Sequence, residues 1–264
     1  MIETETTQMS GPIFAVRNLS VTLGGAAILR DLSFEITPGI TGLIGANGCG
    51  KTTLLRSLAG VLRPTAGEIR HRGQDLARLS PKTRARAIAL LPQTGEAPPG
   101  LTVRELVARG RTPWLRPFLP LTPADHQAVA RAIAATGMGD LAHRRVESLS
   151  GGQRQRAWIG LVLAQESGTI LLDEPLNFLD LPHQAELVRL LKTLSAKRQI
   201  VIIIHDLTLA ARLCDQIIAL RDGALIAHGP TAEVLAAAPL ERAFAIPFDC
   251  VETASGPVVL PRGI

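Results

Sequence analysis

A glycine-rich stretch that ends in lysine and threonine has the residue types best suited to binding phosphate. It fits the pattern G-x-x-x-x-G-K-[ST] and consists of Gly45, Ala46, Asn47, Gly48, Cys49, Gly50, Lys51, Thr52 and Thr53. Glycine lets the backbone curl so that successive N–H groups point into one concavity, where a side chain at Gly45, Gly48 or Gly50 would crowd a phosphate. Lys51 adds a cation for the terminal phosphates, and Thr52 offers a hydroxyl to Mg²⁺. The stretch predicts a nucleotide phosphate site.

Three further polar residues follow apolar segments that have the character of buried strands. A strand predicted over residues 169–172 leads to Asp173 and Glu174, and one over residues 199–204 leads to His205. In open α/β sheets ligands bind at the edge formed by the carboxyl ends of the strands, so Asp173 is a candidate to orient Mg²⁺ and its waters. Glu174 points elsewhere and suits a base for an attacking water, with a surface acid as the alternative. His205 could donate to a γ-phosphate, although a single histidine at a strand end is usually structural.

The elements that must position these residues alternate between strand and helix. Strands are predicted over residues 14–23, 28–36, 40–44, 68–72 and 88–91, and helices follow the phosphate loop and span residues 182–195. Gln93 follows the strand at 88–91 and could accept from water or touch the metal, with an ordinary loop glutamine as the alternative. Thr102, Thr122 and Ser150 occupy N-cap positions of three further predicted helices. Two short helices and two short strands are expected after residue 230.

These patterns predict an α/β fold with a helical segment inserted into the core. We expect a disordered tail over residues 1–12 and an α/β nucleotide-binding core over residues 13–93 and 166–240. The helical insertion is expected over residues 94–165 and a C-terminal extension over residues 241–264.

Composition restricts the function classes. The chain has 264 residues, a net charge of +5 and scattered arginines, so no basic stripe for nucleic acid is visible. No apolar run approaches the length of a membrane span, and the polar N-terminus lacks the character of a secretory signal. The three cysteines have no metal-ligand spacing, so reduced thiols are expected. We therefore expect a cytoplasmic protein that does not bind nucleic acid.

Taken in chain order, the motifs resemble those of ATP-binding-cassette (ABC) ATPases. Residues 45–53 resemble Walker A, Gln93 the Q-loop, residues 170–174 Walker B, residues 177–180 the D-loop, and His205 the switch histidine. The family signature LSGGQ is matched by Leu149, Ser150, Gly151, Gly152 and Gln153, and it is the most specific of these motifs. The resemblance covers nearly the whole chain after the tail.

The resemblance implies a P-loop NTPase core with an N-terminal antiparallel β subdomain and an inserted α-helical subdomain. It implies ATP and Mg²⁺ as ligands, with Thr52, Gln93 and Asp173 at the metal and Glu174, His205, Gln93 and Lys51 in hydrolysis. It also implies that the signature residues Ser150, Gly151, Gly152 and Gln153 of a second copy close over the nucleotide. Asp180 would then lie near the seam, with a helix N-cap as a compatible role. Leu23 replaces the family's usual aromatic residue against the base.

The length of the chain and residues 101–114 point to one branch of the family. The chain carries one cassette, without heptads or a membrane domain, and residues 101–114 are similar to the insertion of importers of iron–siderophores, haem and cobalamin. The resemblance implies permease subunits as partners, indirectly a substrate-binding protein, and a place on the inner face of the membrane. Arg109, Arg111 and Trp114 are expected either to contact the permease or to pack within the insertion. The alternative function is a soluble cassette that energises assembly of a protein complex.

Overall fold

The computed structural model describes residues 11–93, 97–116, 119–177, 179–254 and 256–263. Most of the tail predicted over residues 1–12 lies outside these ranges. The strands are β1 Phe14–Leu23, β2 Ala26–Ile36, β3 Ile40–Ile44, β4 Ala66–His71, β5 Gln74–Asp75, β6 Ile88–Leu91, β7 Thr169–Leu172, β8 Gln199–Ile203, β9 Gln216–Arg221, β10 Ala224–Pro230, β11 Phe248–Thr253 and β12 Gly256–Pro261. The α-helices are α1 Lys51–Leu58, α2 Pro81–Ala87, α3 Val103–Ala108, α4 Pro123–Ala135, α5 Gly151–Ala164, α6 Leu181–Ser195, α7 Leu207–Leu213, α8 Thr231–Val234 and α9 Ala237–Phe244. Short 3₁₀ helices span Leu76–Arg78, Arg109–Trp114, Gly139–Leu141 and Val146–Ser148.

A mixed sheet in the order β10-β9-β3-β8-β7-β6 forms the centre of the molecule. Strands β9, β3, β8, β7 and β6 are parallel, and β10 pairs antiparallel with β9. The carboxyl ends of the parallel strands therefore share one edge. Gly45, Asp173 and His205 follow β3, β7 and β8 within two residues, and Gln93 follows β6 in the same way. The topology brings these four positions to one edge of the sheet.

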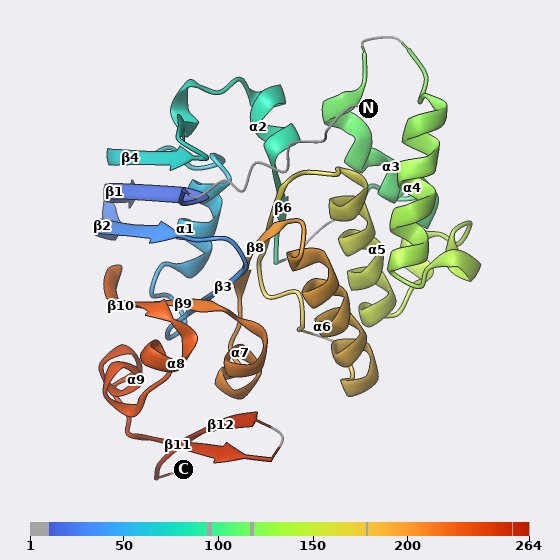
Figure 1. The fold of residues 1–264 in the computed structure, drawn as a ribbon. Helices are drawn as coiled ribbons and strands as arrows, with labels where there is room; N and C mark the ends of the chain where they lie inside the picture. The colour runs from blue at the N-terminus through green and yellow to red at the C-terminus, as the bar shows by residue number, and fades with distance from the viewer. Residues whose placement is uncertain (1–10, 94–96, 117–118, 178, 255, 264) are drawn as a thin grey trace, which may run out of the picture.

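An antiparallel sheet in the order β2-β1-β4-β5 covers one face of the centre together with α1 (Figure 1). Leu54, Leu55 and Leu58 of α1 share one buried apolar cluster with Phe14 of β1 and Leu43 of β3. Burial on both faces explains why β3, β7 and β8 consist mostly of apolar residues. The predicted P-loop core with an antiparallel β subdomain is confirmed.

Helices cover the other face of the central sheet. Leu172 and Ile202 belong to a second buried cluster, in which Val107 of α3, Val129 of α4 and Leu163 of α5 also lie. Helices α3, α4 and α5 form one group in Figure 1, and each begins with a capping box, of which only that of Thr102 and Glu105 was predicted from the sequence. We retain residues 94–165 as the proposed extent of the helical insertion.

Strands β9 and β10 were not predicted from the sequence, although they close one side of the central sheet, and neither was the two-residue strand β5. Strand β9 is buried over most of its length, yet β10 is only partly buried and alternates weakly between apolar and polar residues. Its assignment depends on pairing with β9, which local periodicity does not reveal. By contrast, the C-terminal helices α8 and α9 and the strands β11 and β12 are confirmed.

A buried histidine joins the antiparallel sheet to the central one. The Nε2 atom of His71 in β4 lies 2.9 Å from the Oγ1 atom of Thr169 in β7, and the imidazole ring packs 4.9 Å from the ring of Phe14. Burial, helped by the charge of Arg72, lowers the pKa of His71 from 6.5 to about 4. His71 is therefore neutral in the folded protein at neutral pH.

Acid should destabilise the fold through His71. Below pH 6.5 the unfolded chain protonates this histidine while the folded protein does not, so the free energy of unfolding falls between pH 6.5 and about 4. The largest possible loss from this group is about 3 kcal/mol. Urea unfolding across this pH range should show a shallower fall for His71→Gln than for the unsubstituted protein. An equal fall in the free energy of unfolding for both proteins would mean that protonation of His71 does not cause the loss of stability in acid.

Candidate functional site

The phosphate loop joins β3 to α1, and glycines in left-handed conformations shape it. Gly45, Gly48 and Gly50 have φ angles of 142°, 79° and 105°. A Cβ atom on Gly45 would lie 2.2 Å from the Leu220 carbonyl oxygen, and one on Gly50 would lie 2.6 Å from Leu29 Cδ2. At Gly45 and Gly50 a side chain would therefore collide with the protein itself. At Gly48 no protein atom lies within 4 Å of such a Cβ, so within the protein only its φ requires glycine. The expectation that side chains at the three glycines would crowd a phosphate stays a prediction.

The ammonium group of Lys51 is held beneath this loop. Its Nζ atom donates to the carbonyl oxygens of Gly45, at 2.8 Å, and Ala46, at 2.9 Å, and Lys51 is only 6% exposed. The amides at the start of α1 and this buried cation together favour an anion. The loop therefore fits the terminal phosphates of a nucleotide.

A turn distant in sequence supports the loop. The Gly223 amide, between β9 and β10, donates to the Cys49 carbonyl oxygen at 3.1 Å, and the Gly223 carbonyl accepts from the Arg30 amide at 2.9 Å. A Cβ atom on Gly223, whose φ is 79°, would lie 2.3 Å from the Ile28 carbonyl oxygen. Sequence reasoning missed this position. The Asp222-Gly223 pair signals a turn, but nothing local connects that turn to the phosphate loop.

The Thr52 hydroxyl and the Asp173 carboxylate form a candidate site for a divalent cation. Thr52 Oγ1 donates to Asp173 Oδ1 at 3.3 Å, and Asp173 is 1% exposed. Burial raises the pKa of Asp173, Glu174 adds to this, and the hydrogen bond from Thr52 opposes it. A nearby cation would stabilise this buried carboxylate, and hard oxygen ligands suit Mg²⁺.

Thr52, Asp173 and Gln93 would hold Mg²⁺, which when bound would neutralise charge on the phosphates. The described part of the chain has no group of three or more His, Cys, Asp or Glu side chains able to hold a metal.

Glu174 is the centre of a hydrogen-bonded cluster at the same sheet edge. Its Oε1 lies 2.6 Å from His205 Nε2, and its Oε2 accepts from Gln93 Nε2 at 2.8 Å and Asn177 Nδ2 at 2.5 Å. Burial alone would raise the pKa of Glu174, but the hydrogen bonds and charges of His205, Gln93 and Lys51 outweigh it and lower this pKa. Glu174 is therefore ionised at neutral pH and able to accept a proton. Asn177 was missed as a site residue, although its place three residues after Glu174 was a usable signal.

These groups, except the buried Asp173, surround an open cleft of about 650 Å³. Its lining residues are Ile28, Asn47, Gly48, Gly50, Lys51, Thr52, Thr53, Gln93, Glu174, Asn177 and His205. Gly45, Ala46 and Cys49 shape the loop through their backbone without lining the cleft. Leu23, at the end of β1, is 41% exposed and also lies outside the lining set, so Ile28 is the apolar residue on that side.

The signature residues lie elsewhere. Ser150 caps α5, where its Oγ accepts from the Gln153 amide at 3.3 Å and its amide donates to Gln153 Oε1 at 3.1 Å. Gly151 and Gly152 form the first turn of α5, and none of the four lines the cleft. Asp180 caps α6 by accepting from the His183 amide at 3.2 Å, which confirms its predicted N-cap role. The phosphate loop and the Glu174 cluster thus line one cleft of a single chain, and the signature residues lie outside that cleft. Phe178, in the segment resembling the D-loop, lies outside the described residues.

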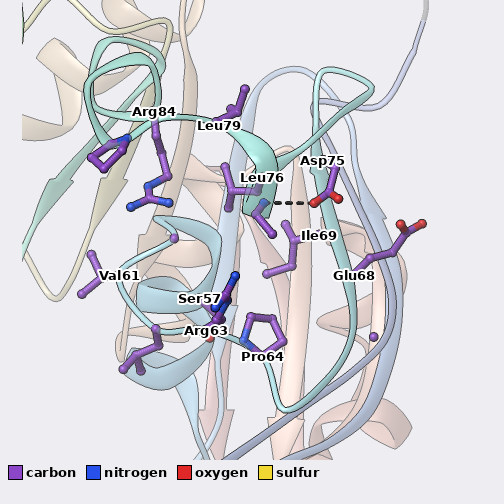
Figure 2. A pocket seen from close by; sticks show the side chains of 15 residues that line it. Ser57, Val61, Arg63, Pro64, Glu68, Ile69, Asp75, Leu76, Leu79 and Arg84 are labelled. Carbon is purple, nitrogen blue, oxygen red and sulfur yellow. Dashed lines mark hydrogen bonds between the residues drawn. The ribbon is translucent and has the colours of Figure 1, made fainter.

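Another cavity, of about 550 Å³, lies between the end of α1 and the segment from β4 to α2. Figure 2 shows Ile69, Leu76 and Pro64 around it, with Arg84 on one side and Glu68 and Asp75 on the other. The carboxylate of Asp75 accepts from the Ala77 amide at 3.0 Å and so caps a 3₁₀ turn. No residue lines both this cavity and the cleft, so it is separate from the phosphate site.

Arg111 and Trp114, two of the three residues considered for contact with a permease, form hydrogen bonds inside the protein instead. Arg111 is 6% exposed and donates to Asp125 Oδ1 at 2.8 Å and Glu166 Oε2 at 2.8 Å. Trp114 Nε1 donates to the Gln165 carbonyl oxygen at 2.8 Å. Packing within the insertion therefore accounts for Arg111 and Trp114, whereas Arg109 is exposed.

Comparison with known proteins gives consistent matches. Residues 29–177 match the family described as ABC transporter. The chain is 43% identical to the probable siderophore transport system ATP-binding protein YusV of Bacillus subtilis, over 94% of this chain and 92% of that protein. It is 40% identical to the ferric enterobactin transport ATP-binding protein FepC of Escherichia coli, over 97% of each. A solved structure described as a metal-chelate type ABC transporter in an inward-facing conformation matches with a TM-score of 0.82 and 26% identity, covering 96% of this chain and 98% of that one. None of the helices in the described ranges is long and apolar enough to cross a bilayer.

Proposed function

The chain belongs to the ATP-binding subunits of the ABC transporter family, and from this premise we propose that it hydrolyses ATP to power import of a ferric siderophore or a related iron, haem or cobalamin complex through a separate permease. The observation that carries the hydrolytic part is the Glu174 cluster beside Lys51 in one cleft. The cargo is inferred from relatives named for siderophore and enterobactin transport, which favour import over the alternative of a soluble assembly ATPase.

Each residue of the cleft has a proposed part in hydrolysis. Lys51 and the loop amides bind the β- and γ-phosphates, and His205 donates to the γ-phosphate. Glu174 accepts a proton from the attacking water, because its lowered pKa keeps it ionised. Gln93 leaves Glu174 to contact water or Mg²⁺. Phosphoryl transfer needs positioning and charge stabilisation more than covalent chemistry, which suits this set of donors.

The position of the signature segment outside its own chain's cleft supports a dimer. Ser150 to Gln153 form a helix N-terminus of exposed and half-buried residues, yet they do not line the cleft of their own chain. We therefore assign them to the nucleotide of a second copy, so that two copies enclose two nucleotides. Asp180 would lie at the seam between the copies.

The permease would contact the segment after Gln93 and the helical insertion, at the inner face of the membrane. Arg109 remains a candidate for that contact, since it is exposed while Arg111 and Trp114 are engaged inside the insertion. A substrate-binding protein would be an indirect partner.

Isolation of the chain from membranes tests the importer assignment. An affinity-tagged chain, extracted with mild detergent from the membranes of its own organism, should retain a permease of many helices. ATP turnover by the reconstituted pair should rise when cargo-loaded binding protein is added. Recovery of soluble partners alone, without any membrane protein, would support the assembly function instead.

Introducing an aromatic residue beside the base should strengthen nucleotide binding. Leu23 lies at the end of β1, opposite Ala26 across the hairpin, and supplies no stacking ring. Leu23→Tyr should tighten ATP binding by about fivefold or more, because base–aromatic stacking contributes roughly 1–3 kcal/mol. Leu23→Ile is the matched apolar control and should leave the affinity unchanged. Calorimetric titration that gives equal affinities for all three proteins would place the base away from residue 23.

A further inference from the structure

The C-terminal hairpin of β11 and β12 belongs to neither of the larger sheets. Its register runs from Phe248 opposite Pro261 to Thr253 opposite Gly256. A two-stranded hairpin is marginally stable in water, so contacts with the rest of the chain must hold it. Phe248 packs edge-on to Phe244 of α9 with ring centroids 5.7 Å apart, and Cys250 Sγ donates to the Leu235 carbonyl oxygen at 2.9 Å.

The other strand of the hairpin packs against α7, as Figure 1 shows near the C-terminus. Thr208 Oγ1 accepts from the Val259 amide at 3.1 Å and donates to the Val259 carbonyl oxygen at 3.3 Å. Arg212, one turn further along α7, donates from Nε to the Pro257 carbonyl oxygen at 3.4 Å. Side chains of α7 thus bond the backbone groups at the free edge of β12, as a neighbouring strand would.

The sequence of β12 fits this arrangement. Residues two apart on a strand direct their backbone groups to the same side, so Pro257 and Pro261 share the outward direction of Val259. Proline has no N–H, which leaves Val259 as the residue of these three able to donate from that edge. The Thr208 hydroxyl pairs with both the Val259 N–H and the Val259 carbonyl oxygen.

Helix α7 carries the switch histidine at its N-terminus. His205 stands directly before the N-cap residue Asp206, whose side chain accepts from the Leu209 amide at 2.8 Å. A helix of seven residues has little stability of its own, so packing determines its orientation. Any rotation of α7 would move His205 Nε2 relative to Glu174 Oε1, and these two atoms lie 2.6 Å apart in the structure.

We propose that the C-terminal hairpin is a brace that positions His205 for hydrolysis and that Thr208 is the positioning residue through which it acts. This inference depends on the proposed role of His205. The phosphate loop is held separately, through Lys51 and Gly223, so loss of the brace affects turnover and leaves nucleotide affinity unchanged.

Single substitutions separate positioning from folding. Thr208→Val keeps the shape of the side chain and removes both hydrogen bonds, so kcat should fall about tenfold, as expected for a small misplacement of a reacting group. The Kd of a fluorescent ATP analogue should not change. Thr208→Ser retains the hydroxyl and should restore kcat. Thr193→Val is the matched control, because Thr193 is exposed on α6 and its Oγ1 donates to the Arg189 carbonyl oxygen of the same helix at 3.0 Å, outside the hairpin and α7. Arg212→Gln, on an exposed side chain, should lower kcat by a smaller factor even if Thr208→Val folds poorly.

A double-mutant cycle supplies the readout that a purely structural role would not give. In a His205→Ala background, Thr208→Val should cause no further loss of turnover, since its effect passes through His205. Additive losses, or a wild-type kcat in folded Thr208→Val and Arg212→Gln, would overturn the brace. If the unsubstituted chain itself does not hydrolyse ATP, the proposed function fails, which is a distinct result.

Discussion

Glu174→Gln should bind ATP normally and hydrolyse it about 10²–10³-fold more slowly than the unsubstituted chain. The amide cannot accept the proton of the attacking water, but it has nearly the same size: its carbonyl oxygen can still accept from Gln93 and Asn177, and its NH₂ group can donate to Nε2 of a neutral His205. The change therefore removes the base and keeps the cleft. Phosphate release under saturating ATP measures the rate, and equilibrium titration measures the affinity.

Glu68→Gln is a matched control for this substitution. Glu68 is a partly exposed carboxylate of β4, paired with Arg70 at 3.1 Å, and it does not line the cleft. Its loss should leave turnover unchanged. Undiminished turnover in Glu174→Gln would remove Glu174 from the role of base and leave water or a phosphate oxygen as the acceptor.

Ser150→Arg should reduce turnover by about 10²–10³-fold without weakening the binding of ATP to a single chain. Ser150 begins α5 and does not line its own cleft, so the substitution leaves the phosphate loop intact. In a dimer, however, the long cationic side chain would obstruct the helix N-terminus that faces the partner's nucleotide. The loss should therefore appear in hydrolysis and dimerisation together.

Thr122→Arg at another N-cap separates this effect from damage to a helix. Thr122 caps α4 with the same kind of capping box, so its replacement removes an equivalent local interaction. It should lower thermal stability to a degree similar to Ser150→Arg and retain turnover. Equal losses of turnover in both variants would assign the effect to the fold of the helical insertion.

The sequence predicted the parts of the site that depend on local pattern. The phosphate loop, the carboxylates after β7 and the N-caps at Thr102, Thr122 and Ser150 each follow from residue types within a few positions. Parallel strands then bring Asp173 and His205 to one edge without further information, because the carboxyl ends of such strands coincide. Most residues that line the cleft could therefore be named in advance, whereas Asn177 and Ile28 could not.

The remaining parts depend on contacts between distant segments. Gly223 supports the phosphate loop and Thr208 binds β12, and each requires knowledge of which elements become neighbours. The side chain of Arg111 illustrates the same difficulty, since only its buried partners distinguish packing from an exposed contact surface. Strand β10 was missed because its pattern is weak without β9 beside it.

Sedimentation velocity of Glu174→Gln, with and without ATP and Mg²⁺, tests most directly whether two copies of the chain enclose the nucleotide. We expect a monomer without ATP, a dimer with ATP, and a monomer under both conditions when Ser150→Arg is added to the same chain. One ATP should be recovered per chain in the dimer. A Glu174→Gln protein that is saturated with ATP and remains monomeric at high concentration would contradict the shared site.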